Sequence, residues 1–257
     1  MKKTTGTHGA LSLSLLSLLL TVLYLVPGAN TQIFAQDVTL HETTTSSGMM
    51  GRGATNTTSA TYISSNAMKI TSSDGNDVII RIDSGKIISI DNNKKTYSEM
   101  TFQQLQAMFD KISAEMGKNQ EQMEAMKKMM GQMSADFAVT KEGPGETIAG
   151  YSTEKYLLKG PMEMELWAAP DLKVPAQYYD AMKLRMPRNP MFDMGKMFDE
   201  MKKINGMALK NITTMKMMNM EMKTTKIVTS VDKSTIPAST FEVPAGYKLI
   251  PNNFDMK

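Results

Sequence analysis

The fold class is decided by the stretch Val78-Ile79-Ile80-Arg81-Ile82-Asp83-Ser84-Gly85-Lys86-Ile87-Ile88-Ser89-Ile90. It contains two short runs rich in isoleucine, a residue enriched in β-strands, and an Asp-Ser-Gly turn signal lies between them. Further strand-like runs precede it at Ala60–Ile63 and Met68–Ile70. Turn residues at Asp74–Asn76 and Asp91–Asn93 separate or end these runs. The pattern predicts an antiparallel β-meander over residues 60–90.

The hydrophobic period changes after this meander. Thr101 is a candidate helix N-cap, and Gln104 stands three residues later, as in a capping box. Apolar residues then recur at alternating spacings of three and four, which predicts one long amphipathic helix or two consecutive ones. They are Phe102, Leu105, Phe109, Ile112, Met116, Met123, Met126, Met130, Met133 and Phe137. The turn Gly143-Pro144-Gly145 ends this segment.

Strand and helix patterns alternate again in the remainder of the chain. Strands are predicted at Tyr151–Leu158, Met162–Ala169, Met207–Thr213, Met215–Thr224 and Lys226–Val231, and helices at Pro175–Met186 and Phe192–Ile204. The tail from Ile236 onward is irregular and punctuated by proline. Strands, a helix, strands, helices and strands in this order favour an α+β domain with one large curved antiparallel sheet and helices on one face.

The first 35 residues have the three parts of a secretory signal peptide. Lys2 and Lys3 supply the positive start, Leu11–Val26 is the apolar segment, and Ile33–Ala35 ends in a small residue suited to cleavage. The apolar run spans about 16 residues, whereas a membrane-spanning helix needs roughly 20. We therefore expect cleavage after Ala35, no integral membrane anchor in the mature chain, and a periplasmic or secreted location.

Composition excludes several function classes. The chain has 29 basic and 26 acidic residues and a net charge of +3, which gives no field suited to holding nucleic acid. It has no cysteine, so a cysteine nucleophile, a disulfide and a lipid-modified cysteine are excluded. His41 is the one histidine after residue 35, and no phosphate-binding loop, dinucleotide fingerprint or nucleophile elbow is present. We expect no enzyme activity and no cofactor.

The 27 methionines allow two interpretations. Thioether sulfur suits Cu(I), and an exported protein can meet copper. Candidate copper ligands are Met215, Met217, Met218, Met220 and Met222, together with the helical Met126, Met129, Met130 and Met133. Alternatively, methionine fills the apolar stripe and, being flexible and polarizable, offers an adaptable surface to varied apolar partners. The second interpretation is favoured, because helical spacing accounts for much of the surplus without a metal.

Three segments, taken in order, resemble an exported bacterial family described as domain of unknown function 4412. The first is Tyr62–Ile70 with Ile87–Asp91 and Lys94–Met100, the second is Ile148–Tyr156 with Glu165–Ala168, and the third is Phe241–Lys248. The resemblance covers most of Ala60–Ile250. It implies a fold similar to the lipoprotein carriers of the Lol pathway, an incomplete antiparallel β-barrel with helices covering its open face and an apolar cavity inside. The family has no settled activity, so the resemblance assigns no function.

The resulting domain prediction is a signal peptide at 1–35, a flexible N-terminal segment at 36–59 and a single half-barrel domain at 60–257. Methionine-rich helical insertions are expected near 101–137 and 176–204. We predict a non-enzymatic protein that holds a lipid, an acyl chain or an apolar peptide in a methionine-lined cavity. The predicted cavity residues are Met123, Met126, Met130, Met133, Met164, Leu166 and Trp167. The alternatives are the Cu(I)/Ag(I) binder and a structural envelope protein that engages a protein partner without a small ligand.

Overall fold

The computed structural model describes residues 37–47, 53–118, 137–160, 163–173, 199–217 and 220–252. Within them, one sheet of 12 strands dominates the molecule. The strands are β1 (Val38–Ser46), β2 (Thr55–Ile63), β3 (Ala67–Ser72), β4 (Asn76–Arg81), β5 (Lys86–Asp91), β6 (Thr96–Thr101), β7 (Ala138–Pro144), β8 (Glu154–Lys159), β9 (Glu163–Ala169), β10 (Met207–Met217), β11 (Met220–Asp232) and β12 (Lys248–Leu249). The described helices are α2 (Phe102–Lys118), the 3₁₀ helix η1 (Ala238–Phe241) and a helical turn at residues 199–201.

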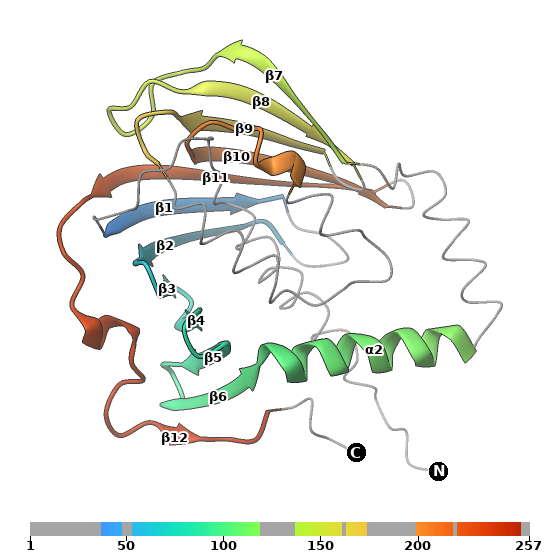
Figure 1. Ribbon diagram of the computed structural model, residues 1–257, viewed down its shortest axis with the longest axis vertical. Coiled ribbons are helices and arrows are strands. Elements are labelled where there is room, and N and C mark those ends of the chain that lie inside the picture. Colours follow the sequence, from blue (N-terminus) through green and yellow to red (C-terminus); the bar gives the residue numbers. More distant parts are fainter. Residues whose placement is uncertain are drawn as a thin grey trace.

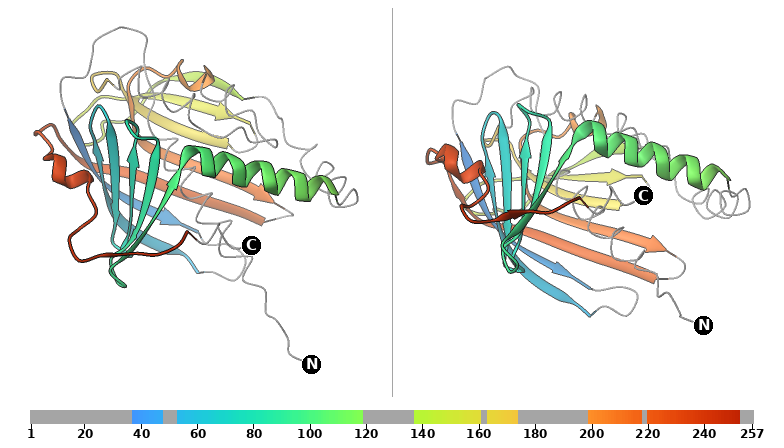
Figure 2. Two further views of the ribbon diagram at one scale, coloured as in Figure 1. Left: turned by 60° about the horizontal axis from the view of Figure 1, so that its bottom comes forward. Right: turned by 90° about the horizontal axis from the view of Figure 1, so that it is seen from below.

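The sheet consists of two antiparallel meanders joined side by side. Within β1 to β6, and again within β7 to β11, strands that are consecutive in sequence pair with each other, and β7 lies at the outer edge. Pairing of β1 with β11 joins the two meanders, and β12 adds to β6 in parallel. The sheet is not closed, and its edge strands are β12 and β7. It curves strongly, so that it has a concave and a convex face (Figures 1 and 2).

The strands that decided the fold class are confirmed. In the register of β4 and β5, Ile80 lies opposite Ile87, and Ile79 lies opposite Ile88. Successive residues of a strand point to opposite faces. The first pair belongs to the large core cluster of the sheet and the second to a separate smaller cluster. The unbroken isoleucine runs therefore reflect strands that are buried on both faces.

The prediction that residues 36–59 form a flexible segment is wrong for most of these residues. Residues 38–46 form β1, which pairs with β2 on one side and β11 on the other, in the middle of the sheet. Threonine has high strand propensity when neighbouring strands pair on both sides, so a run rich in Thr and Ser need not be a loop. Residues 207–217 and 220–232 also differ from the prediction, since they form the two long strands β10 and β11 rather than three shorter ones.

The C-terminal tail accounts for the burial of the convex face at one end of the sheet. After β11 it runs along the outside of the curve through η1 and then reaches the edge of β6 (Figure 1). Phe241 of η1 packs with Ala67, Ile79, Ile88 and Ile90. The Tyr247 hydroxyl also donates to Asn92 Oδ1 at 2.8 Å. Residues 241–248, the third segment of the family resemblance, therefore pack against the outside of the sheet.

Helix α2 begins with the predicted capping box. The Thr101 N–H donates to Gln104 Oε1 at 2.8 Å, and the Gln104 N–H donates to Thr101 Oγ1 at 3.1 Å. Phe102 and Leu105 of the first turn are buried in the large cluster. The rest of α2 runs away from the strands (Figure 2). Residues 119–136 and 174–198, which include most of the predicted helical insertions, lie outside the described residues.

Thr101→Ala is expected to lower the free energy of unfolding by about 1 kcal/mol, because it removes the oxygen that accepts from the Gln104 N–H. Urea denaturation followed by circular dichroism measures the effect. Gln103→Ala is the matched control, since Gln103 is exposed in the same turn and carries no capping bond. Equal stability of the two variants would contradict the energetic role of the cap.

Candidate functional site

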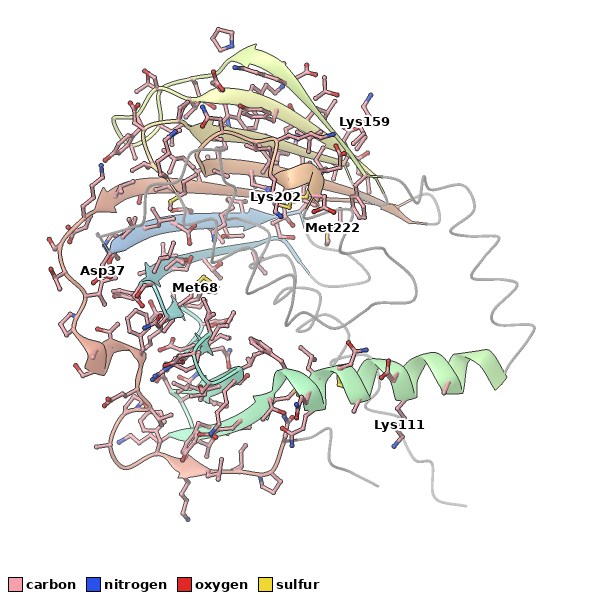
Figure 3. The ribbon with its side chains drawn as sticks, viewed as in Figure 1. Asp37, Met68, Lys111, Lys159, Lys202 and Met222 are labelled. Carbon is pink, nitrogen blue, oxygen red and sulfur yellow. The ribbon has the colours of Figure 1, made fainter. Side chains whose placement is uncertain are left out.

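The concave face of the sheet is lined with apolar side chains. They include Val38, Leu40, Met68, Ile80, Leu158, Met164, Leu166 and Leu209, all 3% exposed or less. Met68 on β3 and Met222 on β11 are labelled in Figure 3, and Met222 is half-buried on the face that carries Lys226. Strands from both meanders therefore contribute to one apolar surface.

A set of polar side chains interrupts this apolar surface at its centre, and we call it the central polar cluster. Its members come from four neighbouring strands, β2, β1, β11 and β10. They are Ser59, Thr61, Glu42, Lys226, Asn211 and Thr213. All but Ser59 are buried, between 1% and 6% exposed. The cluster thus crosses the junction between the two meanders.

An ion pair is the core of the central polar cluster. Lys226 Nζ lies 2.7 Å from Glu42 Oε1, and both side chains are less than one-tenth exposed. The Thr61 hydroxyl donates to Glu42 Oε2 at 2.6 Å, and the Ser59 hydroxyl donates to the same oxygen at 3.5 Å. Burying two charges costs several kcal/mol per ion, on the order of what their attraction returns, so hydrogen bonds of this kind decide whether the pair is tolerated.

Asn211 is the member whose hydrogen bonding is incomplete. The Thr213 hydroxyl donates to Asn211 Oδ1 at 2.8 Å, so this end of the amide is hydrogen-bonded. Asn211 Nδ2 is buried and has no hydrogen-bond partner. In register, Asn211 lies between Leu166 of β9 and Lys226 of β11. A buried donor without an acceptor costs about 1–3 kcal/mol, so this group calls for an explanation.

Tyr156 supplies another polar group beside the apolar wall. Its hydroxyl donates to Glu154 Oε2 at 2.7 Å and accepts from the Asn205 N–H at 3.3 Å. Burial, and then the hydrogen bond to Glu154, raise the pKa of Tyr156 to about 12. The phenol therefore stays protonated near neutral pH and serves as a hydrogen-bond donor rather than as a nucleophile.

The structure separates the predicted cavity residues. Met164 and Leu166 lie on the concave face and are fully buried. Trp167 lies on the opposite face, where Lys155 and Lys210 sit 5.1 Å and 4.4 Å from its ring centroid. The prediction that Trp167 lines the same surface as its neighbours is wrong, because adjacent strand residues point to opposite faces. Met123, Met126, Met130 and Met133 lie outside the described residues.

The second methionine group lies at the end of the β10–β11 hairpin. Met215 pairs with Met222 and Met217 pairs with Met220, so these positions form two cross-strand pairs on the face that carries Lys226. Met218 lies outside the described residues. Among the residues that the structure describes, no group of three or more His, Asp or Glu side chains is placed to hold a metal ion.

His41 lies on the convex face, next in sequence to Glu42 of the central polar cluster. It borders an open hollow of about 460 Å³ lined mainly by hydroxyl side chains, among them Thr43, Thr58, Thr71 and Thr229. The Thr229 hydroxyl donates to the main-chain oxygen of His41 at 3.1 Å.

Sequence reasoning missed the central polar cluster. Glu42 stands within the segment predicted to be flexible, and Lys226 starts a predicted strand as one of many lysines. Their proximity depends on the β1–β11 pairing, which joins strands from the two ends of the described chain. The polar residues on otherwise apolar strands, such as Asn211 among Leu209 and Ile212, were the signal available.

The model of a family described as "Domain of unknown function (DUF4412)" matches residues 49–247. No curated protein matches the chain. Across the described residues, no helix is long and apolar enough to cross a membrane.

Similar solved structures share little sequence with the chain. An uncharacterized conserved protein from Thermus thermophilus has a TM-score of 0.45 at 6% identity, with 85% of this chain and 92% of that chain covered. A LolA superfamily protein from Nitrosomonas europaea has a TM-score of 0.31 at 6% identity, covering 82% and 92%. A putative outer membrane lipoprotein-sorting protein domain from Vibrio parahaemolyticus has a TM-score of 0.31 at 8% identity, covering 80% and 89%.

Proposed function

The chain belongs to the family described as domain of unknown function 4412, and since that description names no activity, we propose a function from the geometry of the chain itself. The protein is an exported, non-enzymatic binding protein. It holds a lipid, an acyl chain or an apolar peptide against the concave face of its sheet. Export follows from the predicted signal peptide at residues 1–35, which lies outside the described residues.

One observation carries the proposal: apolar side chains line the concave face of a strongly curved sheet that is not closed. A concave, mostly apolar surface with a few convergent polar groups is the usual form of a small-molecule site. Fully buried residues such as Met164 and Leu166 supply the apolar wall. The central polar cluster supplies the polar groups.

The helical segments near 101–137 and 176–204 act in this proposal as a cover over the open side of the sheet. Support comes from α2, whose first turn packs against the large cluster through Phe102 and Leu105 while the remainder leaves the strands. Methionine suits such a cover, because its flexible and polarizable side chain accommodates apolar groups of varied shape. Met123, Met126, Met130 and Met133 are the proposed contacts in this segment.

The Cu(I)/Ag(I) alternative has its own supporting observation. Cross-strand pairing sets Met215 opposite Met222 and Met217 opposite Met220. Directly opposed residues have Cβ atoms about 4.5–5.5 Å apart, and thioether sulfur is a ligand that suits soft cations. The alternative requires sulfur, whereas a lipid surface tolerates leucine.

Native mass spectrometry of residues 36–257, purified from the compartment to which the cell exports them, tests the proposal. We expect a bound mass of several hundred daltons that is lost on organic extraction, because an apolar ligand co-purifies with its binding surface. Anaerobic titration with Cu(I) provides the second arm. Stoichiometric Cu(I) adducts that survive a chelator and disappear in Met215→Leu with Met222→Leu, in a sample without lipid, would overturn the proposal in favour of copper.

A further inference from the structure

We propose that Asn211 Nδ2 donates a hydrogen bond to a carbonyl oxygen of the bound ligand, so that the protein selects acyl esters and amides over plain hydrocarbon. The inference rests on the proposed function and assigns a polar contact within the same concave face. It starts from the one buried side-chain nitrogen or oxygen of the described residues that lacks a hydrogen-bond partner.

One end of the Asn211 amide is hydrogen-bonded and the other is not. The Thr213 hydroxyl donates to Asn211 Oδ1 at 2.8 Å, so the acceptor end of the amide is occupied. The donor end, Nδ2, is left facing its surroundings with no partner. Asn211 is 1% exposed and Thr213 is 2% exposed, so bulk water does not satisfy this donor. A ligand that supplies one acceptor oxygen completes the hydrogen bonding of the amide.

The neighbouring side chains define the rest of the ligand. In register, Leu166 lies on one side of Asn211, and Met164 lies opposite Thr213; both are fully buried and apolar. On the other side, Lys226 is already paired with Glu42, so the cluster presents no net charge to a ligand. A long apolar body that carries a neutral carbonyl matches these surroundings better than a carboxylate or a phosphate does.

The alternative explanation of the orphan donor is a single buried water molecule. Such a water needs two to four polar partners. Thr213 has its hydroxyl on Asn211, and Thr61 has its hydroxyl on Glu42. Leu166 and Met164 offer no polar atom, so a water that accepts from Asn211 Nδ2 would have to donate to an oxygen of the cluster, such as the Thr213 hydroxyl. A ligand carbonyl needs only the one donor that Asn211 provides.

Two probes with the same number of carbon atoms test the inference: methyl laurate, which has an ester carbonyl, and tridecane, which has none. Both are delivered from methyl-β-cyclodextrin to residues 36–257, and binding is followed by displacement of N-phenyl-1-naphthylamine. We expect the protein to bind methyl laurate more tightly than tridecane by about tenfold, since an unmade buried hydrogen bond is costly. Asn211→Leu is expected to remove this preference while its affinity for tridecane is kept.

Asn56→Leu is the matched control, since it makes the same substitution at an exposed position on β2. It is expected to keep the tenfold preference. Unchanged tridecane affinity in Asn211→Leu shows that this variant is folded. If the unmodified protein binds both probes equally, as it would with a buried water at Asn211, the inference is overturned. The proposal that the concave face binds apolar ligands then still stands. Binding of neither probe overturns the proposed function as well.

Discussion

Lys226→Met is expected to lower the free energy of unfolding by about 3–5 kcal/mol, because it leaves the buried Glu42 carboxylate without its cation. Glu42 is 4% exposed, and its remaining partners are the hydroxyls of Thr61 and Ser59. Two neutral donors do not replace an ammonium group 2.7 Å away. Methionine keeps much of the apolar stem of lysine, so the loss reports the charge rather than a cavity.

Two further variants separate this effect from a general sensitivity to lysine replacement. Adding Glu42→Gln to Lys226→Met removes the remaining charge and is expected to restore most of the stability. Lys86→Met breaks a comparable ion pair with Glu99 at 3.0 Å, but these side chains are 43% and 35% exposed. Its expected cost is therefore below about 1 kcal/mol. Urea denaturation measures all three, and equal losses in Lys226→Met and Lys86→Met would refute the argument from burial.

Gly206→Ala is expected to lower the free energy of unfolding by about 3–4 kcal/mol, because it combines a strained backbone conformation with an overlap with the main chain. Gly206 precedes β10 and has φ +102°, a conformation that residues with a Cβ rarely adopt. A Cβ atom added there would overlap the carbonyl group of Ala169 at the end of β9. Because the obstacle is backbone rather than a flexible side chain, one of the two strands must shift.

Gly150→Ala isolates the conformational part of this cost. Gly150 has φ +83°, but a Cβ atom there meets nothing within 4 Å. We therefore expect a loss of about 1–2 kcal/mol, the cost of the left-handed conformation alone. Thermal or urea denaturation of the two variants gives the comparison. If Gly206→Ala is as stable as Gly150→Ala, the overlap with Ala169 does not destabilise the protein, and the argument is contradicted.

Local patterns predicted what depends on neighbours in sequence. The β3–β5 meander follows from short isoleucine-rich runs separated by Asp, Asn and Gly turns, and the cap of α2 follows from Thr101 and Gln104. Family membership was predicted correctly from three short segments, and the family model covers residues 49–247. These features need no knowledge of which distant strands pair.

Features that depend on pairing between strands distant in sequence could not be predicted from local patterns. The threonine-rich β1 becomes a central strand only because β2 and β11 flank it. Of the predicted cavity residues, Met164 and Leu166 lie on the concave face, whereas Trp167 lies on the opposite face beside Lys210. Glu42 and Lys226 gave no local signal, since each is an ordinary charged residue until the β1–β11 ladder brings them together.

The junction of β1 with β11 also sets an order for folding. Each meander is built from strands that pair with near neighbours in sequence, and such local contacts form early. The junction aligns Thr39 with Asp232 and so closes a loop that contains nearly the whole described chain. Until residue 232 is available, β1 and β10 both carry unpaired edges, which are templates for aggregation. We therefore expect docking of two preformed meanders to limit the folding rate, and a chain truncated before β11 to aggregate rather than to persist as a smaller sheet.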